Sequence, residues 1–137
     1  LEQAKKLYAY TINIYPDNQA AINNFLILIG EEDPESALEQ FLRLDKVIRD
    51  NHILKAQIAY ILTLQTEYEA ALNYVQAALM LSPGNPKYIY NKAVILDKLN
   101  LKKEAKFLYQ EILRSGSYNV IGVSGENIRK RIKNLGV

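Results

Sequence analysis

The sequence has no cysteine and no tryptophan, and it has one histidine, His52, among 137 residues. Without thiols the chain forms no disulfide bonds and has no thiol nucleophile, which leaves its redox compartment undecided. A zinc site needs several histidine, cysteine or carboxylate ligands held together. We therefore expect His52 to be a partly exposed surface residue that binds no metal.

The chain also lacks the short motifs of common catalytic and cation-binding sites. The acidic cluster at residues 31–35 does not have the alternating spacing of a calcium loop. Residues 122–125, Gly-Val-Ser-Gly, lack the Gly-Lys-Ser/Thr of a phosphate-binding loop. Ser124 has no histidine to activate it except His52, which is far away in the sequence. We therefore expect no enzyme activity, no cofactor and no metal ion.

Long hydrophobic runs are missing as well. No apolar run approaches the ~20 residues that cross a membrane, so we expect no membrane insertion. No signal peptide is visible, and the chain begins at Leu1 rather than Met, which we interpret as a fragment of a longer chain. This interpretation allows a cytoplasmic protein, or a periplasmic one if an upstream signal has been removed.

The charge is small overall and uneven along the chain. The net charge is +2. Residues 1–50 have 5 Lys/Arg and 9 Asp/Glu, a net of −4, while residues 102–137 have 8 and 3, a net of +5. Solvated helix faces explain this distribution, because exposed charges contribute little energy. The alternative is end-to-end association of copies, or steering of a charged partner.

Small and apolar residues recur at one fixed spacing along the chain. Ala71 lies midway in the sequence between Ala37 and Ala105. The other series with the same spacing are Phe25, Ala59 and Ala93; Leu28, Leu62 and Leu96; Phe41, Val75 and Tyr109; and Leu44, Ala78 and Ile112. A fixed period of ~34 residues predicts a stack of repeated helix pairs. The alanines are expected to let neighbouring helices approach closely.

The spacing of apolar residues and the capping signals predict the helices. The predicted helices cover residues 1–15, 18–30, 34–48, 52–65, 68–81, 86–99, 102–115 and about 125–135, and the segment before the last helix is predicted to be a loop. Pro16 and Gly30 end the first two helices, and Asp33 caps the third. The chain divides into complete pairs at 18–51, 52–85 and 86–119, after the second helix of an earlier repeat at 1–17 and before a loop and capping helix at 120–137.

This period, together with part of a signature, resembles the tetratricopeptide repeat (TPR) family, whose signature is W-x2-L-G-x2-Y, then A-x3-F, then P. The first half falls on Ala21, Asn24, Phe25 and Leu28, on Lys55, Ile58, Ala59 and Leu62, and on Ile89, Lys92, Ala93 and Leu96. The second half falls on Ala4, Tyr8 and Pro16, on Ala37 and Phe41, on Ala71, Val75 and Pro83, and on Ala105 and Tyr109. Asn24, Lys55 and Lys92 depart from the apolar residues that the family prefers. The resemblance implies an all-α fold, a right-handed superhelical α-solenoid of antiparallel helix pairs with a C-terminal capping helix.

The resemblance also implies a concave groove lined by the first helix of each pair. The groove residues selected as a peptide-binding site are Asn23, Leu26, Gln57, Tyr60, Lys87, Tyr90, Asn91 and Val94. Asn23, Gln57 and Asn91 form a ladder of side-chain amides, and each amide both donates and accepts hydrogen bonds. Some members of the family hold extended peptides with such amides. Tyr60 and Tyr90 add aromatic contact area.

Two alternatives to this peptide site stay open. In the first, the amides serve a neighbouring repeat or water. In the second, the site is the family's carboxylate clamp, whose places fall on Ile22, Leu26, Gln57, Lys87 and Asn91. Only Lys87 fits that clamp well and Gln57 fits it loosely, whereas capture of a C-terminal carboxylate needs more positive charge.

The predicted last helix is amphipathic and basic. Its apolar residues are Ile128, Ile132 and Leu135, and its basic residues are Arg129, Lys130, Arg131 and Lys133. A capping helix with its basic face in water explains the pattern. The alternative is a basic patch for nucleic acid or an anionic membrane surface.

These observations predict a non-catalytic protein-interaction module or scaffold that binds a peptide or partner segment in its groove. The resemblance is compatible with an adaptor in bacterial secretion, pilus or envelope assembly. The alternative is a structural self-association module that forms homo-oligomers. An RNA-binding helical repeat fits less well, because the groove lacks the basic lining that phosphates demand, so no nucleic-acid partner is expected.

Overall fold

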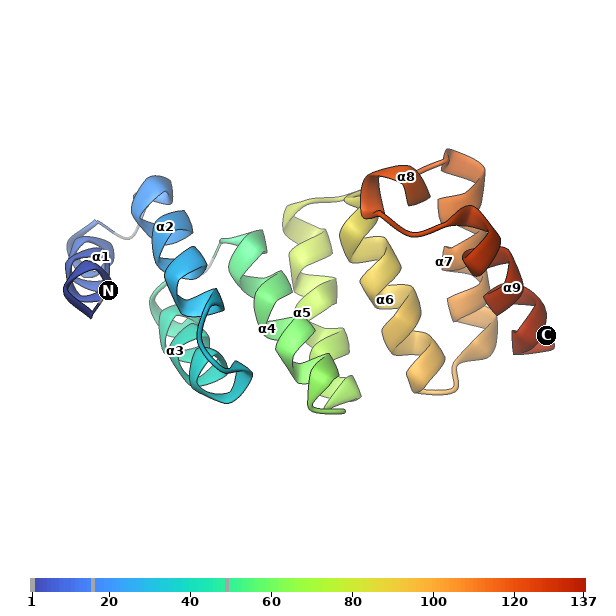
Figure 1. Cartoon of the computed structure of the whole chain (residues 1–137), viewed down its shortest axis with the longest axis horizontal. Helices are drawn as coiled ribbons and strands as arrows, with labels where there is room; N and C mark the ends of the chain where they lie inside the picture. The colour runs from blue at the N-terminus through green and yellow to red at the C-terminus, as the bar shows by residue number, and fades with distance from the viewer. Residues whose placement is uncertain (1, 16, 49) are drawn as a thin grey trace.

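The computed structural model describes residues 2–15, 17–48 and 50–137, and within these residues every regular element is a helix. The helices are α1 (Glu2–Ile14), α2 (Gln19–Gly30), α3 (Pro34–Val47), α4 (His52–Leu64), α5 (Tyr68–Leu81), α6 (Pro86–Lys98), α7 (Lys102–Ser115), α8 (Tyr118–Ile121) and α9 (Gly125–Leu135). They stand side by side in an elongated array with the chain ends at its two extremes (Figure 1). The all-α prediction is therefore confirmed.

Polar side chains begin most of the helices. The Asn18 side chain accepts a hydrogen bond from the backbone N–H of Ala21 at 3.0 Å, and Asp33 accepts one from Ser36 at 3.0 Å. The caps of α4, α6 and α9 are Asn51, Asn85 and Ser124. Such caps satisfy donors that the first helical turn leaves free. The predicted helices are confirmed closely, whereas the predicted break at Pro16 lies outside the described residues.

One predicted loop contains a helix that the sequence analysis missed. The single turn α8 lies between Gly116 and Gly122, both in the left-handed region with φ of 70° and 81°. The Tyr118 ring packs over Gly125, where an added Cβ would come within 3.2 Å of the ring. Tyr118, Ile121 and Val123 are partly buried against the C-terminal core cluster, whereas Val120 is exposed. This packing holds the turn in place.

The alanines of the repeating series lie in the interior. Ala37, Ala59, Ala71, Ala93 and Ala105 are all buried, and none is more than 3% exposed. One apolar cluster runs from α1 to α6 and a second from α6 to α9. α4 packs against α5 and α6 against α7, while α5 also packs against α6 and joins one pair to the next. This confirms that the small residues mark the places where helices meet.

α9 covers the C-terminal end of the array. Ile128 and Leu135 are buried as the helix packs against α7. The expectation that the basic face lies in water needs a correction at Arg131, whose guanidinium donates two hydrogen bonds to Asp97 of α6, at 2.5 and 2.6 Å. The cap is therefore tied to α6 as well as to α7.

Candidate functional site

The first helices of the pairs, α2, α4 and α6, carry the residues of the predicted peptide-binding site. The exposed ones are Asn23, Gln57, Tyr60 and Lys87, and the half-buried ones are Tyr90, Asn91 and Val94. We call these seven residues the first-helix surface. It carries amides, aromatic rings and one lysine, so it is suited to binding rather than to acid–base chemistry.

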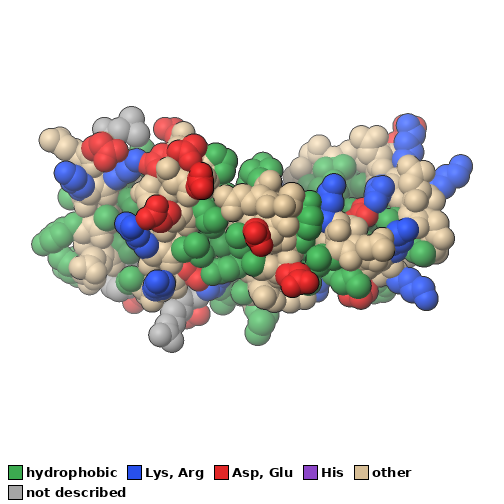
Figure 2. All heavy atoms as spheres, turned by 90° about the horizontal axis from the view of Figure 1, so that it is seen from below, with side chains coloured by type: hydrophobic (Ala, Val, Ile, Leu, Met, Phe, Trp, Pro, Cys, Tyr) green, Lys and Arg blue, Asp and Glu red, His purple; other side chains and the backbone are tan. Residues whose placement is uncertain are grey.

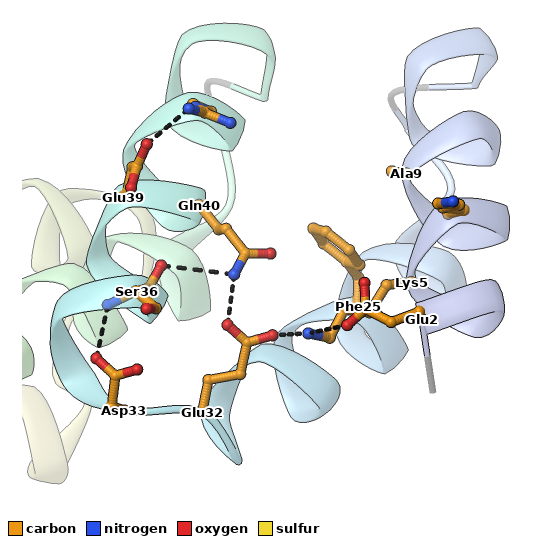
Figure 3. Close-up of a pocket in the computed structure, with 11 residues that line it drawn as sticks. Glu2, Lys5, Ala9, Phe25, Glu32, Asp33, Ser36, Glu39 and Gln40 are labelled. Carbon is orange, nitrogen blue, oxygen red and sulfur yellow. Dashed lines mark hydrogen bonds and ion pairs between the residues drawn. The ribbon is translucent and has the colours of Figure 1, made fainter.

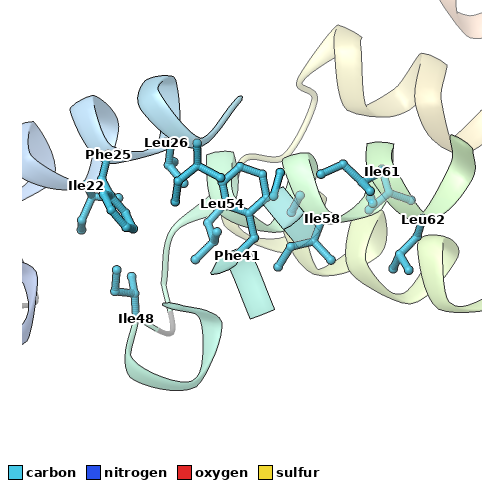
Figure 4. Packing of buried hydrophobic residues seen from close by; sticks show 14 of the residues in the cluster. Ile22, Phe25, Leu26, Phe41, Ile48, Leu54, Ile58, Ile61 and Leu62 are labelled. Carbon is cyan, nitrogen blue, oxygen red and sulfur yellow. The ribbon is translucent and has the colours of Figure 1, made fainter. Parts of the chain in front are cut away.

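Leu26, the eighth predicted residue, does not belong to this surface. Its side chain is 6% exposed and points toward Phe41 and Leu54 in the core (Figure 4). The cause is the rotation of α2 about its axis. Asn24 is exposed, whereas Ile58, at the corresponding place in the next pair, is fully buried. Because a polar residue occupies the usual core position, α2 turns Leu26 inward instead.

Among the described residues, the amides of the predicted ladder have no hydrogen-bond partners. Within residues 2–15, 17–48 and 50–137, no side-chain hydrogen bond is formed by Asn23, Gln57 or Asn91. In contrast, the Asn51 amide donates to the Gln19 side chain at 3.2 Å. An exposed amide without an internal partner is available to water or to a ligand.

Apolar side chains flank the central amide on α4. Ile53, Tyr60 and Leu64 are 38%, 55% and 55% exposed, and they lie on the same side of the helix as Gln57. Single exposed apolar residues are common on protein surfaces. Several of them on one helix face, with the Gln57 amide between them, form an exposed and largely apolar strip along α4.

Tyr90 is supported by a network that extends to the cap. Its ring centroid lies 6.2 Å from that of Tyr109, whose hydroxyl donates to Asp97 at 3.1 Å. Burial raises the pKa of Tyr109, and the nearby Asp97 carboxylate adds to this. The hydrogen bonds from Arg131, with that from Tyr109, hold the pKa of Asp97 below its usual range. Sequence reasoning missed this network, although Asp97 and Arg131 are separated by one repeat period.

Lys55, one of the departures from the TPR signature, is explained by a largely buried ion pair. Its Nζ lies 2.7 Å from Oδ1 of Asp45 on α3 and 5.8 Å from the centre of the Tyr74 ring on α5. The two charged side chains are 17% and 14% exposed. Because burying charges costs solvation energy, the pair is better suited to fixing how three helices meet than to adding stability.

His52 is partly buried and connects two first helices. Its Nδ1 lies 2.7 Å from the hydroxyl of Tyr88, a buried residue of α6. Burial raises the pKa of Tyr88. In the part of the chain that the structure describes, no group of three or more His, Asp or Glu side chains is placed to hold a metal ion.

Among the described residues, none of the helices combines the length and the apolar character that spanning a bilayer requires.

Comparison with a solved structure shows the fold. The chain superposes on the crystal structure of MamA with a TM-score of 0.65, over 96% of this chain and 84% of MamA. The sequence identity is 15%, so this likeness concerns the fold alone. The chain is an α-solenoid of TPR-like helix pairs, as the sequence predicted.

Two known proteins are similar in sequence. Human protein O-mannosyl-transferase TMTC3 is 26% identical over 140 residues, and the alignment covers 95% of this chain and 15% of the human protein. A protein of Cyanophora paradoxa named ycf37, itself uncharacterized, is 34% identical over 94 residues, covering 64% of this chain and 53% of that protein. The chain thus spans only part of each relative. No protein-family profile matches it.

Proposed function

We propose that this chain is a non-catalytic protein-interaction module whose first-helix surface binds an extended peptide segment of a partner protein. The observation that carries the proposal is the set of three amides on three successive first helices, two exposed and one half-buried (Asn91), that have no hydrogen-bond partners among the described residues. A primary amide pairs with a peptide N–H or C=O whatever the side chains of the peptide are.

The remaining residues of the first-helix surface supply contact area around the amides. Tyr60 and Tyr90 are of the type that anchors interfaces, and Tyr90 is braced by Tyr109. A preorganised ring loses little conformational freedom when it binds. We expect a dissociation constant of about 1 μM, or about −8 kcal/mol. The coarser role, a protein-interaction scaffold, is supported by the TPR-like fold that the chain shares with MamA.

An adaptor role in bacterial secretion, pilus or envelope assembly remains a prediction within this proposal. It rests on the resemblance to the TPR family and on the short array with a distinct final helix.

A pull-down with matched variants tests the proposal. The wild type is compared with Asn23→Ala/Gln57→Ala/Asn91→Ala, which removes the amides of the first-helix surface. A second triple variant, Asn73→Ala/Gln110→Ala/Asn134→Ala, removes exposed amides on other helices. We expect captured proteins to be lost only from the first variant. Identical captured proteins from all three would remove the amides from the mechanism.

A second candidate function, self-association, is favoured by a different observation. α1 exposes Leu7, Tyr10 and Ile14, which are 63%, 65% and 45% exposed, at the N-terminal end of the array. On the face that Figure 2 draws, acidic and basic side chains are mixed over the N-terminal helices, acidic ones lie over the central helices, and mainly basic ones lie over the C-terminal helices. Helical spacing places the three apolar residues near one another on α1.

Sedimentation at low and high salt separates the two functions. Association through opposite charges weakens with added salt. Association through the apolar side chains of Leu7 and Ile14 does not weaken with salt, and it is lost in the double variant Leu7→Ser/Ile14→Ser. A monomer at both salt concentrations would exclude self-association and leave peptide binding as the function to test.

A further inference from the structure

A cleft separates α1 from α3 at the N-terminal end of the array. It has two adjoining parts of about 780 Å³ and about 330 Å³. Ala9, Phe25, Gln40 and Arg43 line both parts, so the two are continuous. Figure 3 shows α1, with Lys5 and Ala9, facing Gln40 of α3 across an open space. The cleft shares no residue with the first-helix surface.

The turn between α2 and α3 differs from its counterparts in the chain. After α4 and α6, Thr66 and Asn100 are left-handed, with φ of 61° and 64°. In both turns the backbone N–H of the next residue donates a hydrogen bond of 2.9 Å to a carbonyl oxygen of the preceding helix, and this bond closes the C-terminal end of that helix tightly. Glu32 has the same place after α2 but is not left-handed. α2 and α3 accordingly pack less closely than α4 and α5.

Phe25 adds a side-chain cause to this backbone cause. It occupies the place of Ala59 and Ala93, which are buried where the later pairs come into close contact. A phenyl ring cannot fit into a space that a methyl group fills, because helix interfaces are close-packed. The ring therefore holds the cleft open, and it forms part of the lining of both parts.

The cleft has an apolar end and a charged end. The apolar lining consists of Ala9, Ile12, Phe25, Leu44 and Val47, and the side chain of Val47 is 50% exposed. The charged lining has four carboxylates, Glu2, Glu32, Asp33 and Glu39, and three cations, Lys5, Lys6 and Arg43. Carboxylates thus outnumber cations in the cleft, within an N-terminal segment, residues 1–50, that has a net charge of −4.

A polar network fixes the charged end. Lys5 of α1 forms an ion pair with Glu32, and Gln40 of α3 donates to the other Glu32 oxygen at 2.5 Å. Lys5 and Glu32 are 15% and 20% exposed. Because one carboxylate contacts both walls, the spacing of the walls is set at this end. Arg43 is engaged by Glu39 at 2.6 Å.

We propose that this cleft binds an amphipathic helix of a partner protein, with aliphatic side chains in the apolar end and lysine or arginine side chains beside the carboxylates. The excess of carboxylates favours a basic partner. A helix is the expected form because the walls are two helices and this array covers its apolar helix faces with other helices. No edge of a β-sheet is available in the described residues for strand addition.

A synthetic amphipathic helix of leucine and lysine serves as the probe. Titration of the probe into the ¹⁵N-labelled chain is expected to shift the backbone resonances of Ala9, Phe25, Gln40 and Val47. The matched probe with glutamate in place of lysine is expected to bind at least about tenfold more weakly, because it places like charges together. Equal binding of both probes would overturn the charge argument.

Charge-reversal variants locate the binding. Glu39→Lys places a positive charge in the cleft lining, and Glu35→Lys makes the same change on α3 outside it. We expect Glu39→Lys to weaken binding of the leucine–lysine probe about fivefold, and Glu35→Lys to change it less than about twofold. Val47→Ser, a change at the half-exposed rim, is expected to weaken it as well.

Three results would overturn the proposal. The first is that the resonance shifts fall on the first-helix surface instead of the cleft. The second is that Glu35→Lys and Glu39→Lys weaken binding of the probe equally. The third is that the chain alone forms an oligomer that Glu39→Lys disperses, because a second copy of the chain would then be the occupant of the cleft. The Asn23/Gln57/Asn91 alanine variant is expected to keep probe binding, so failure of peptide binding at the first-helix surface leaves the cleft proposal standing.

Discussion

At the scale of single residues, buried alanines set the distance between helices. Ala71 of α5 is fully buried, and we expect Ala71→Leu to lower the free energy of unfolding by about 1–3 kcal/mol because the added carbons have no space. Urea unfolding followed by circular dichroism measures the change. Asn73→Leu, at an exposed position on the same helix, is the control and should stay within about 0.5 kcal/mol of wild type. An unchanged Ala71→Leu variant would contradict close packing at α5.

The Asp97 carboxylate is predicted to make stability depend on pH. The Arg131 and Tyr109 hydrogen bonds hold the pKa of Asp97 below its ordinary 3.8. The ionised form therefore stabilises the fold above pH 3.8, and the contribution is lost as pH falls through the lowered pKa. Arg131 is about half exposed (49%), so we expect Asp97→Asn to cost about 1 kcal/mol at neutral pH.

Unfolding of wild type and Asp97→Asn at neutral pH and near pH 2 measures the effect. We expect the difference between the two proteins to shrink at the acidic end. A difference that stays the same at both pH values would show that the effect does not come from the charge of Asp97, because the side-chain oxygen of Asn can still accept the hydrogen bond from Tyr109.

Single residues also show how far local patterns reach. The cap at Asp33 was predicted because a cap depends only on the few residues that follow it. The pair of Lys55 and Asp45 was not predicted, although both residues were visible in the sequence, because their meeting depends on how α3 and α4 dock. Lys55 appeared only as a departure from an apolar preference, and the structure supplies the carboxylate that explains it.

At the scale of helices, their positions along the chain were predictable and their rotation was not. Apolar spacing and caps placed α2 correctly, yet Leu26 is buried where the TPR resemblance implied a groove. The physical reason is Asn24, which is exposed at a usual core position. α8 escaped prediction because a single turn has too little periodicity to recognise, and it is held by the packing of Tyr118 and Ile121 on the C-terminal core cluster.

The docking of α9 is a testable property of that helix. Ile128 is 2% exposed against the C-terminal core cluster, so Ile128→Ala is expected to cost about 2–5 kcal/mol. Stability in a repeat array is a sum of neighbouring interfaces. The loss is therefore expected to appear mainly in hydrogen exchange of α7 and α9. Lys130→Ala, at an exposed position on the same helix, should leave exchange unchanged, and equal loss across α2–α5 would contradict the repeat picture.

At the scale of the whole molecule, the repeat period predicted the array but not its irregular end. The array follows from the period because each interface copies the one before it. The cleft between α1 and α3 arises where the chain departs from the repeat pattern. Phe25 stands there in place of an alanine, and Glu32 stands in place of a left-handed turn residue. A period describes what repeats share, so a site formed by a departure from it became visible only in the assembled structure.

This irregularity predicts uneven stability along the array. α1, α2 and α3 enclose the cleft and pack less closely than α4–α7, and loosely packed interfaces open at lower free energy. We expect backbone amides of α1–α3 to exchange hydrogen about tenfold to a hundredfold faster than those of α4–α5, because a difference of about 1.4–2.8 kcal/mol in opening free energy has that effect. Hydrogen exchange, measured by mass spectrometry on the intact chain, gives this difference in rates.

If the leucine–lysine helix fills the cleft, adding the helix should slow hydrogen exchange in α1–α3 and leave the exchange of α7 unchanged. Equal protection of the backbone amides in all helix pairs without the probe would mean that the interface with Phe25 is packed as closely as the interfaces with alanine.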